Sequence, residues 1–392
     1  MVTTEITNQS WLGRIGESIK SVLFGLVLFV ASFPVLWLNE GRAVRTEKGL
    51  HEGQGAVVDA SADRVDPSMN GKLVHVAGKA STAEQISDPD FGVAPAGALK
   101  LRRRAEMFQW EEEKKSETEK KTGGGSVTKT TYSYSKKWSD RLIDSSGFKE
   151  SGHDNPSKMA FESRDTQAQQ VTLGAYKLSD SLVGKMDDYE PVALTDQDLA
   201  KIASKEASFK VAENAFFLGE HPQDPAIGDL RVSFSVVKPG DYSVVAKQSA
   251  STFEPFPTAS GYQIELLKRG IVPAQAMFLA ALQQNTILTW VLRVVGFILM
   301  FIGMALVFRP ISVFGDVIPL FGSLLAFGTG LFALVMSGVL SVMTIAVAWI
   351  FYRPFLGIAL LAAAIAVLVW FAMRGRKKIA AAVAARPAVA AS

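Results

Sequence analysis

The chain has 392 residues, of which 48% are hydrophobic, and its formal net charge is +3. So small a charge does not indicate nucleic-acid binding, and we expect no nucleic-acid partner. Cysteine is absent, which excludes thiol catalysis, disulfides and any cysteine-based zinc site. The length is sufficient for two or three domains, or for one domain and a membrane part.

The first predicted element is a membrane span at residues 21–38, which carry no charge. Eighteen residues just cross a hydrocarbon core. A signal peptide cleaved after Ser32 is the alternative. The apolar run continues past that residue to Leu38, and Trp37 lies where an interfacial anchor belongs. We therefore expect an uncleaved span that follows a cytoplasmic N-terminus at residues 1–20.

Residues 39–286 hold most of the charge and are predicted to form a β-rich extracytoplasmic domain. Period-two segments occur at 71–78, 98–113, 127–138, 228–237, 241–249 and 262–270. The openings of 71–78 and 228–235 are alike, which leaves two related β modules open, although coincidence is the simpler explanation.

Three local structures are expected within this domain. Residues 105–138 are expected to form a long β-hairpin with a Gly-rich tip, in which Trp110, Tyr132 and Tyr134 are cross-strand partners. The sequence KPGD at 238–241 predicts a second hairpin turn. A helix is expected at 195–208, because Thr195 and Asp198 have the spacing of a capping box.

The C-terminal third is predicted to contain three further spans, at residues 287–308, 328–352 and 355–373. The segment 309–327 contains Asp316 and Pro319, so we expect a cytoplasmic interfacial or re-entrant piece there. Residues 374–392 form a basic and then Ala-rich tail. The cluster at 374–378 places this tail in the cytoplasm by the positive-inside rule.

Individual residues of these spans have expected roles. Arg293 lies near the start of its span and is expected to reach the interface as an anchor. Arg353 and Pro354 are expected to break the helix, to anchor the turn and to produce an antiparallel hairpin. Gly296 and Gly303 lie on one face and are candidates for helix packing, either within one chain or between copies.

Candidate chemical motifs are few. The four histidines have no metal spacing, and His75 is expected to be a satisfied structural residue. The segment GHDNPS at 152–157 is interpreted as a turn rather than a metal site. SDPDFGV at 87–93 is interpreted as an Asx-turn rather than a calcium loop. TGGGS at 122–126 lacks the residues of a phosphate loop. We therefore predict no catalytic, cofactor-binding or metal-binding residue, and no enzyme.

Several short segments lie in a fixed order over nearly the whole chain. They are LNEGRA (38–43), GKLVHVAG (71–78), SDPDFGV (87–93), LKLRRRAEMFQW (99–110), TYSYSKKW (131–138), HDNPSKMAFES (153–163), GDLRVSFS (228–235), TWVLRVVGF (289–297) and AWIFYRPF (348–355). In order and spacing they resemble the LUMA family (transmembrane protein 43). The resemblance implies a multi-pass protein of the inner nuclear membrane and endoplasmic reticulum, or a bacterial relative. It also implies self-association through the spans and the organisation of membrane protein complexes.

The predicted fold is a multi-pass α-helical membrane protein with four spans and a large β-rich α+β extracytoplasmic domain. The predicted function is that of a non-enzymatic scaffold, with the lipid bilayer, a second copy of itself and other membrane proteins as partners. An oligomeric channel or channel-modulating subunit is the alternative, and no cofactor is expected. The expected location is a bacterial inner membrane with the middle domain in the periplasm. In a eukaryote it is the endoplasmic reticulum or inner nuclear membrane, with that domain in the lumen.

Overall fold

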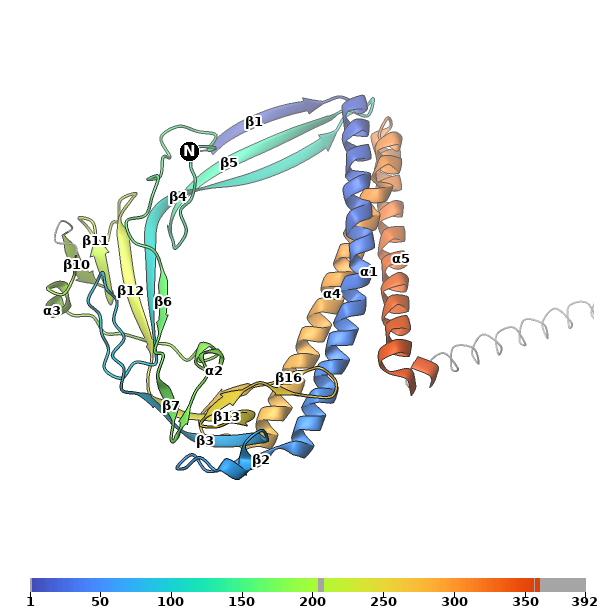
Figure 1. Cartoon of the computed structure of the whole chain (residues 1–392). Helices are drawn as coiled ribbons and strands as arrows, with labels where there is room; N and C mark the ends of the chain where they lie inside the picture. Colours follow the sequence, from blue (N-terminus) through green and yellow to red (C-terminus); the bar gives the residue numbers. More distant parts are fainter. Residues whose placement is uncertain (1, 204–207, 356, 360–392) are drawn as a thin grey trace, which may run out of the picture. The chain divides into compact units, whose positions relative to one another are not determined.

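The computed structural model describes residues 2–203, 208–355 and 357–359 and divides the chain into two compact units. The β unit comprises Met1–Trp11 and Thr46–Gln284, and the helical unit comprises Leu12–Arg45 and Asn285–Ser392. Two long helices, α1 (Trp11–Ala56) and α4 (Ala274–Gly315), each contribute residues to both units (Figure 1).

The helical unit is built from α1, α4 and α5 (Pro319–Tyr352). All three helices are long and apolar enough to cross a membrane, with mean hydropathies of 2.3, 2.5 and 2.3 over their most apolar windows. The described residues therefore contain three candidate spans and a large β-rich region. Most of the predicted fourth span, 355–373, lies outside the described residues.

The segment 309–327, predicted to be an interfacial or re-entrant piece, is mostly helical. Helix α4 continues to Gly315, and α5 begins at Pro319, so only a short turn separates them. Proline favours the first position of a helix because its missing N–H has no partner there in any case. The break at Arg353 is confirmed: α5 ends at Tyr352, and Arg353 has non-helical φ and ψ of −134° and 65°. A residue before proline avoids the helical region.

The β unit contains a large sheet of eight strands. Its main order is β1 (Val2–Gln9), β5 (Ser126–Ser139), β4 (Lys100–Lys120), β12 (Leu230–Val237), β11 (Ala215–Leu218) and β10 (Phe209–Ala212). Two short strands lie off this path, β6 (Arg164–Gln167) against β4 and β9 (Glu190–Pro191) against β12. Strands β1, β5 and β4 lie side by side as a long arm (Figure 1).

A second sheet has seven strands. They are, in order, β17 (Leu266–Arg269), β13 (Gly240–Ser249), β14 (Thr252–Glu254), β8 (Tyr176–Lys177), β7 (Val171–Leu173), β3 (Leu73–Thr82) and β2 (Val58–Ala60). Because β13 also pairs with β3, the strands from β13 to β3 close into a ring. The remaining elements are the ribbon β15 (Phe256–Pro257) with β16 (Gln263–Ile264), the 3-10 turn η1 (Pro67–Met69), α2 (Asp180–Gly184) and α3 (Asp196–Leu199).

The long β-hairpin is confirmed. Strands β4 and β5 pair without interruption from Met107 opposite Ser139 to Lys120 opposite Ser126. The expected pairing among the aromatic residues is wrong, because Trp110 lies opposite Lys136 and Tyr134 opposite Glu112. The turn fixes the register of the hairpin and so decides which side chains lie opposite each other. In this register the aromatic residues of the two strands are diagonal neighbours rather than direct partners.

The second predicted hairpin is wrong. Strand β12 forms eight pairs with β4, and β13 forms eight pairs with β3, so Lys238 and Pro239 carry the chain from one sheet to the other. Each strand thereby gains a full-length partner that a hairpin between the two would have displaced. The predicted helix at 195–208 is shorter than expected. Its capping box at Thr195 is confirmed, but α3 ends at Leu199.

Strand β1 at Val2–Gln9 was not predicted. The sequence predicts only a cytoplasmic N-terminal segment for these residues. The alternation VTTEIT is a strand pattern, but its short length and position at the end of the chain gave it no weight.

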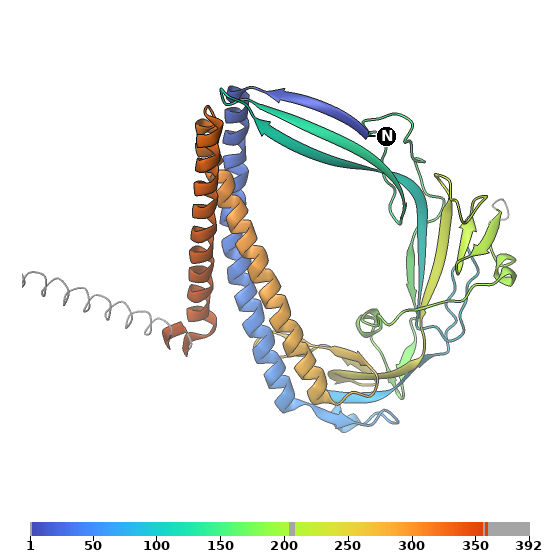
Figure 2. The ribbon, with the colours of Figure 1, turned by 180° about the vertical axis from the view of Figure 1, so that it is seen from behind.

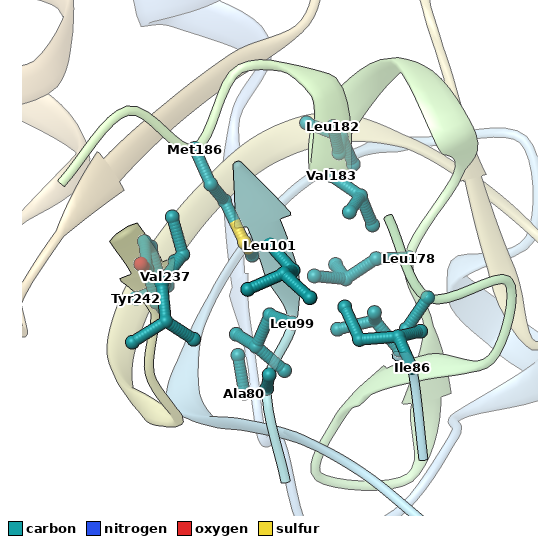
Figure 3. Close-up of a cluster of buried hydrophobic side chains, with 14 of the residues drawn as sticks. Ala80, Ile86, Leu99, Leu101, Leu178, Leu182, Val183, Met186, Val237 and Tyr242 are labelled. Atoms are coloured by element: carbon teal, nitrogen blue, oxygen red, sulfur yellow. The ribbon is translucent and has the colours of Figure 1, made fainter. Parts of the chain in front are cut away.

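The two sheets and α2 share one hydrophobic core (Figure 3). Leu99, directly before β4, and Leu101, at its start, lie among side chains from the second sheet and from the segment around α2. The other labelled members are Ala80, Ile86, Leu178, Leu182, Val183, Met186, Val237 and Tyr242. Burial raises the pKa of Tyr242 to about 12, so its hydroxyl remains a neutral donor to Asp188. This core joins both sheets into one unit.

A buried ion pair fixes the loop that covers this core. Asp88 accepts hydrogen bonds from the backbone N–H groups of Asp90 and Phe91, as the predicted Asx-turn requires. The Arg103 guanidinium, also buried, lies 3.0 Å from the Asp88 carboxylate and 2.5 Å from that of Asp90. Arginine therefore neutralises a carboxylate that the turn has already placed in the interior.

Replacing Arg103 with methionine is expected to lower the free energy of unfolding by about 3–5 kcal/mol, because the Asp88 charge would remain buried without its partner. Arg104→Met is the matched control, since the Arg104 side chain is 59% exposed. It should cost less than about 0.5 kcal/mol. Thermal unfolding of the solubilised full chain measures both. Equal unfolding midpoints for the two variants would contradict the assignment.

Candidate functional site

Seven polar and aromatic side chains form the candidate site, named here the polar layer. It lies in the helical unit and draws on all three long helices. Helix α1 contributes Asn39, Glu40 and Arg42, α4 contributes Asn285, Thr289 and Arg293, and α5 contributes Trp349. On α4 these residues are four apart and share one helix face. An apolar helix that places polar groups on one face indicates contacts with protein rather than lipid.

Glu40 is the centre of the polar layer and is only 1% exposed. Its carboxylate accepts two hydrogen bonds from Arg293, at 2.6 and 2.9 Å, and a third from the indole Nε1 of Trp349, at 2.7 Å. A bidentate guanidinium–carboxylate pair satisfies both partners in a fixed geometry. One carboxylate on α1 therefore ties α4 and α5 together.

Two indole rings line the guanidinium of Arg293. Its central carbon lies 4.7 Å from the ring centroid of Trp290 and 5.7 Å from that of Trp349. Trp290 is three residues before Arg293, so one helix turn brings the ring beside the charge. Aromatic faces attract a guanidinium and exclude water from it. The sequence predicts that Arg293 extends to the interface as an anchor, whereas the structure pairs it within the protein.

The second half of the polar layer is a hydrogen-bond network around Arg42. Its guanidinium donates to the Asn285 amide oxygen at 2.7 Å and to the Thr289 hydroxyl at 2.9 Å. The Asn39 amide donates to the Thr289 carbonyl at 3.0 Å, and the Asn285 amide donates to the Ala43 carbonyl at 3.0 Å. Side chains of each helix thus bond the backbone of the other, which fixes the register between α1 and α4.

A second ion pair lies in the same unit at the turn between α4 and α5. Asp316 is 1% exposed, and its carboxylate lies 2.5 Å from the Arg14 guanidinium on α1. A Cβ atom added at Gly322 would collide with the Asp316 side chain, so only glycine fits there. A charged Asp316 is unfavourable in lipid. Its ion pair with Arg14 explains how this carboxylate is tolerated at the turn.

The predicted packing glycines lie against α1 of the same chain. A Cβ atom at Gly303 would approach the backbone N of Phe29 to 2.5 Å and the carbonyl O of Gly25 to 2.8 Å. One at Gly296 would approach Leu36 to 2.5 Å. Such contacts allow two helix backbones to come close. These faces are occupied within the chain.

The other predicted residues lie at the end of α5. The Trp37 ring contacts the rings of Phe351 and Tyr352, with centroids 5.3 and 5.8 Å apart. Arg353 follows as the C-cap of α5, and its N–H donates to the Trp349 carbonyl. Trp37, Arg353 and Pro354 thus lie near the end of α5, whereas Arg293 belongs to the polar layer.

Glu40, Arg42 and Asn285 belong to the polar layer but were not predicted from the sequence. An available signal was charge complementarity: one arginine inside an apolar span requires a carboxylate, and Glu40 follows another span by two residues. The sequence separation between Glu40 and Arg293 is 253 residues, so periodicity could not pair them.

Histidines in the β unit have structural roles. The prediction for His75 is confirmed, since its Nδ1 lies 2.7 Å from Asp59 and its Nε2 lies 2.9 Å from the Val272 carbonyl. His153 stacks on Tyr134 and meets Trp110 edge-on. Among the described residues, no group of three His, Asp or Glu side chains could hold a metal ion.

Comparison with known proteins identifies relatives over nearly the whole chain. A profile of the family described as Transmembrane protein 43 matches residues 107–354. Transmembrane protein 43 of Homo sapiens is 36% identical over 357 residues, which cover 88% of this chain and 87% of the relative. The Transmembrane protein 43 homolog of Drosophila melanogaster is 29% identical over 381 residues, covering 92% and 97%. No solved structure matches the chain.

The polar layer predicts a non-additive pair of substitutions. Glu40→Leu and Arg293→Leu should each destabilise the solubilised protein by about 3–5 kcal/mol, because each leaves a charge that is at most 17% exposed without its partner. The double variant should recover most of that loss, since leucine is compatible with an apolar helix interface. The readout is the thermal unfolding midpoint of each variant in one detergent.

Arg309→Leu is the control, because it removes an exposed arginine from the same helix. It should leave the midpoint nearly unchanged. A double variant whose loss equals the sum of the two single losses would show that Glu40 and Arg293 stabilise the protein independently.

Proposed function

This chain belongs to the transmembrane protein 43 family, and we propose that it is a non-enzymatic membrane scaffold that self-associates and organises membrane protein complexes. The proposal needs a rigid helical unit that presents an apolar outer surface and a separate domain that presents protein surfaces. Both kinds of part are present among the described residues.

The closed polar layer carries the proposal. Two of its three charges, Glu40 and Arg293, neutralise each other, and the indole of Trp349 uses a further carboxylate lone pair. The third, Arg42, donates hydrogen bonds to Asn285 and Thr289. Internal pairing fixes the helices and leaves their outer faces apolar. Leu324 and Phe327 on α5 are among the large side chains exposed there. Such faces suit contacts with lipid and with other spans, where packing drives association.

A channel or channel-modulating subunit is the second candidate, and the polar layer is also the observation that favours it. Asn39, Arg42 and Thr289 are the kind of side chains that can line a hydrated path. In this structure they bond one another, as do Glu40 and Arg293. Conduction would require these bonds to open, whereas a scaffold requires them to persist.

The proposal includes the predicted topology. A fourth span at 355–373 would place the tail on the same side as the N-terminal residues 1–20. The break at Arg353 and Pro354 supports a return of the chain at that point. The middle domain would then lie on the opposite side, in the periplasm of a bacterium or in the lumen of a eukaryotic endoplasmic reticulum or nuclear envelope.

Self-association should be detectable by disulfide trapping, because the natural chain has no cysteine. Leu324→Cys and Phe327→Cys lie on the exposed face of α5 and should give disulfide-linked dimers in native membranes. Ser337→Cys is the buried control on the same helix and should give none. Monomeric protein at every position, together with a monomeric native mass in mild detergent, would contradict the scaffold.

Reconstituted protein should pass no ions under a voltage step. The reason is that the polar side chains of the helical unit are engaged with one another rather than with water. Planar-bilayer recording of the purified wild type measures this, with protein-free liposomes as the reference. Currents that change when Arg293 or Arg42 is substituted would overturn the scaffold proposal in favour of the channel.

A further inference from the structure

The outer edge of β5 carries an extended strand in this structure. Strand β1 pairs with it antiparallel, from Val2 opposite Ser133 to Gln9 opposite Ser126. Both strands belong to the β unit, and β1 is the last strand of the eight-stranded sheet. Figures 1 and 2 show β1 running along β5 on the arm. The ladder is therefore a complete docking of one extended segment onto one sheet edge.

Chain connectivity conflicts with this pairing once α1 crosses a membrane. Helix α1 begins at Trp11, directly after β1, and the chain returns to the β unit at Thr46. A single crossing between these points places β1 on one side of the bilayer and β5 on the other. The β1–β5 ladder and a membrane-spanning α1 are thus mutually exclusive in one chain.

The composition of α1 decides between them. Residues 21–38 contain twelve Val, Leu and Phe residues and no charge. Leu23 and Phe24 are 70% and 61% exposed on the helix surface, which favours a lipid environment for this apolar segment. Each such side chain favours insertion, whereas β1 is an edge strand whose backbone bonds water can replace. Insertion of α1 as a single crossing would therefore withdraw β1 and open the β5 edge.

We propose that the β5 edge between Ser126 and Ser133 is a strand-acceptor site for a partner polypeptide on the side of the middle domain. The occupant is an extended segment that carries a carboxylate at the position of Glu5. This proposal deepens the scaffold function, on which it rests, by naming a surface through which a partner is held.

The carboxylate preference follows from the contacts of Glu5. Its two oxygens accept hydrogen bonds from the Tyr132 hydroxyl and the Lys149 ammonium, each at 2.9 Å. The hydrogen bonds from Lys149 and Tyr132 also lower the pKa of Glu5, so the site favours the ionised form. Thr3 adds a bond of 2.8 Å to Glu150. The backbone hydrogen bonds supply affinity. The Tyr132 and Lys149 donors fix the one position at which the bound strand carries a carboxylate.

A second copy of β1 cannot be the occupant. Every copy whose α1 spans the bilayer in the same direction carries its own β1 to the far side. An open edge that is neither bulged nor covered invites another strand. The remaining self-contact, β5 against β5 of another copy, is distinguished by the experiment below.

Disulfide trapping in native membranes tests the withdrawal of β1. The pair Thr4→Cys and Thr131→Cys lies directly opposite in the ladder and should remain reduced after oxidation. The control pair Ser116→Cys and Thr130→Cys crosses β4 and β5 in the same arm and should form its disulfide. Equal yields from both pairs would show that β1 stays on β5 and would overturn the proposal.

A peptide probe tests the vacant edge. The probe has the sequence of Val2–Gln9 with cysteine at the Thr4 position, and it is offered to membranes on the side where Lys115→Cys reacts with an impermeant maleimide. It should form a mixed disulfide with Thr131→Cys and not with Thr118→Cys on the other edge of the arm. The probe with glutamine in place of Glu5 should bind at least roughly fivefold more weakly.

Two further results decide the occupant. Failure of the probe to react above the Thr118→Cys background would overturn the acceptor site while leaving dimer trapping at Phe327→Cys unaffected. A Thr131→Cys dimer that forms without the probe would assign the edge to a second copy and overturn the proposed partner. Loss of the glutamate preference in Tyr132→Phe with Lys149→Met would support the assigned contacts.

Discussion

The carboxylate of Glu40 is the group on which the helical unit depends. It is buried, and an unpaired charge in an apolar surrounding is far less stable than a paired one. Arg293 and Trp349 complete its hydrogen bonds from two other helices, so the three helices have one arrangement that satisfies it. Close contacts at glycine then bring α1 and α4 together. The ion pair and its hydrogen bonds fix the register of the three helices. Close van der Waals packing then holds the helices together, because lipid provides no hydrophobic driving force for their association.

The β unit is stabilised differently from the helical unit: because water surrounds its surface, it is held together by a hydrophobic core. Two sheets share a core that includes Leu99 and Leu101, and β12 connects directly to β13 across that core. The buried charge of Arg103 sits at the rim of the core and is matched by Asp88 from a preformed turn. In both units a buried carboxylate, Asp88 or Glu40, is thus neutralised by an arginine from another part of the chain.

Local structure was predictable from the sequence, and long-range pairing was not. The β4–β5 hairpin, the Asx-turn at Asp88 and the break before Pro354 each depend on residues close in sequence. The partners of β12 and β13 depend on which distant strand offers the longer ladder, and a turn motif does not report that. Charge balance indicates that Arg293 needs a carboxylate partner, but it does not identify Glu40 as that partner.

The two helices that lead out of the β unit are attached to the same sheet. Strand β2 follows α1 and pairs with β3, while β17 precedes α4 and pairs with β13, and β3 and β13 are neighbours. Tension applied between the two helices would consequently run through four adjacent strands. The eight-stranded sheet and its arm lie outside that load path. A pull between the ends of α1 and α4 that enter the β unit would therefore stress this anchoring sheet first.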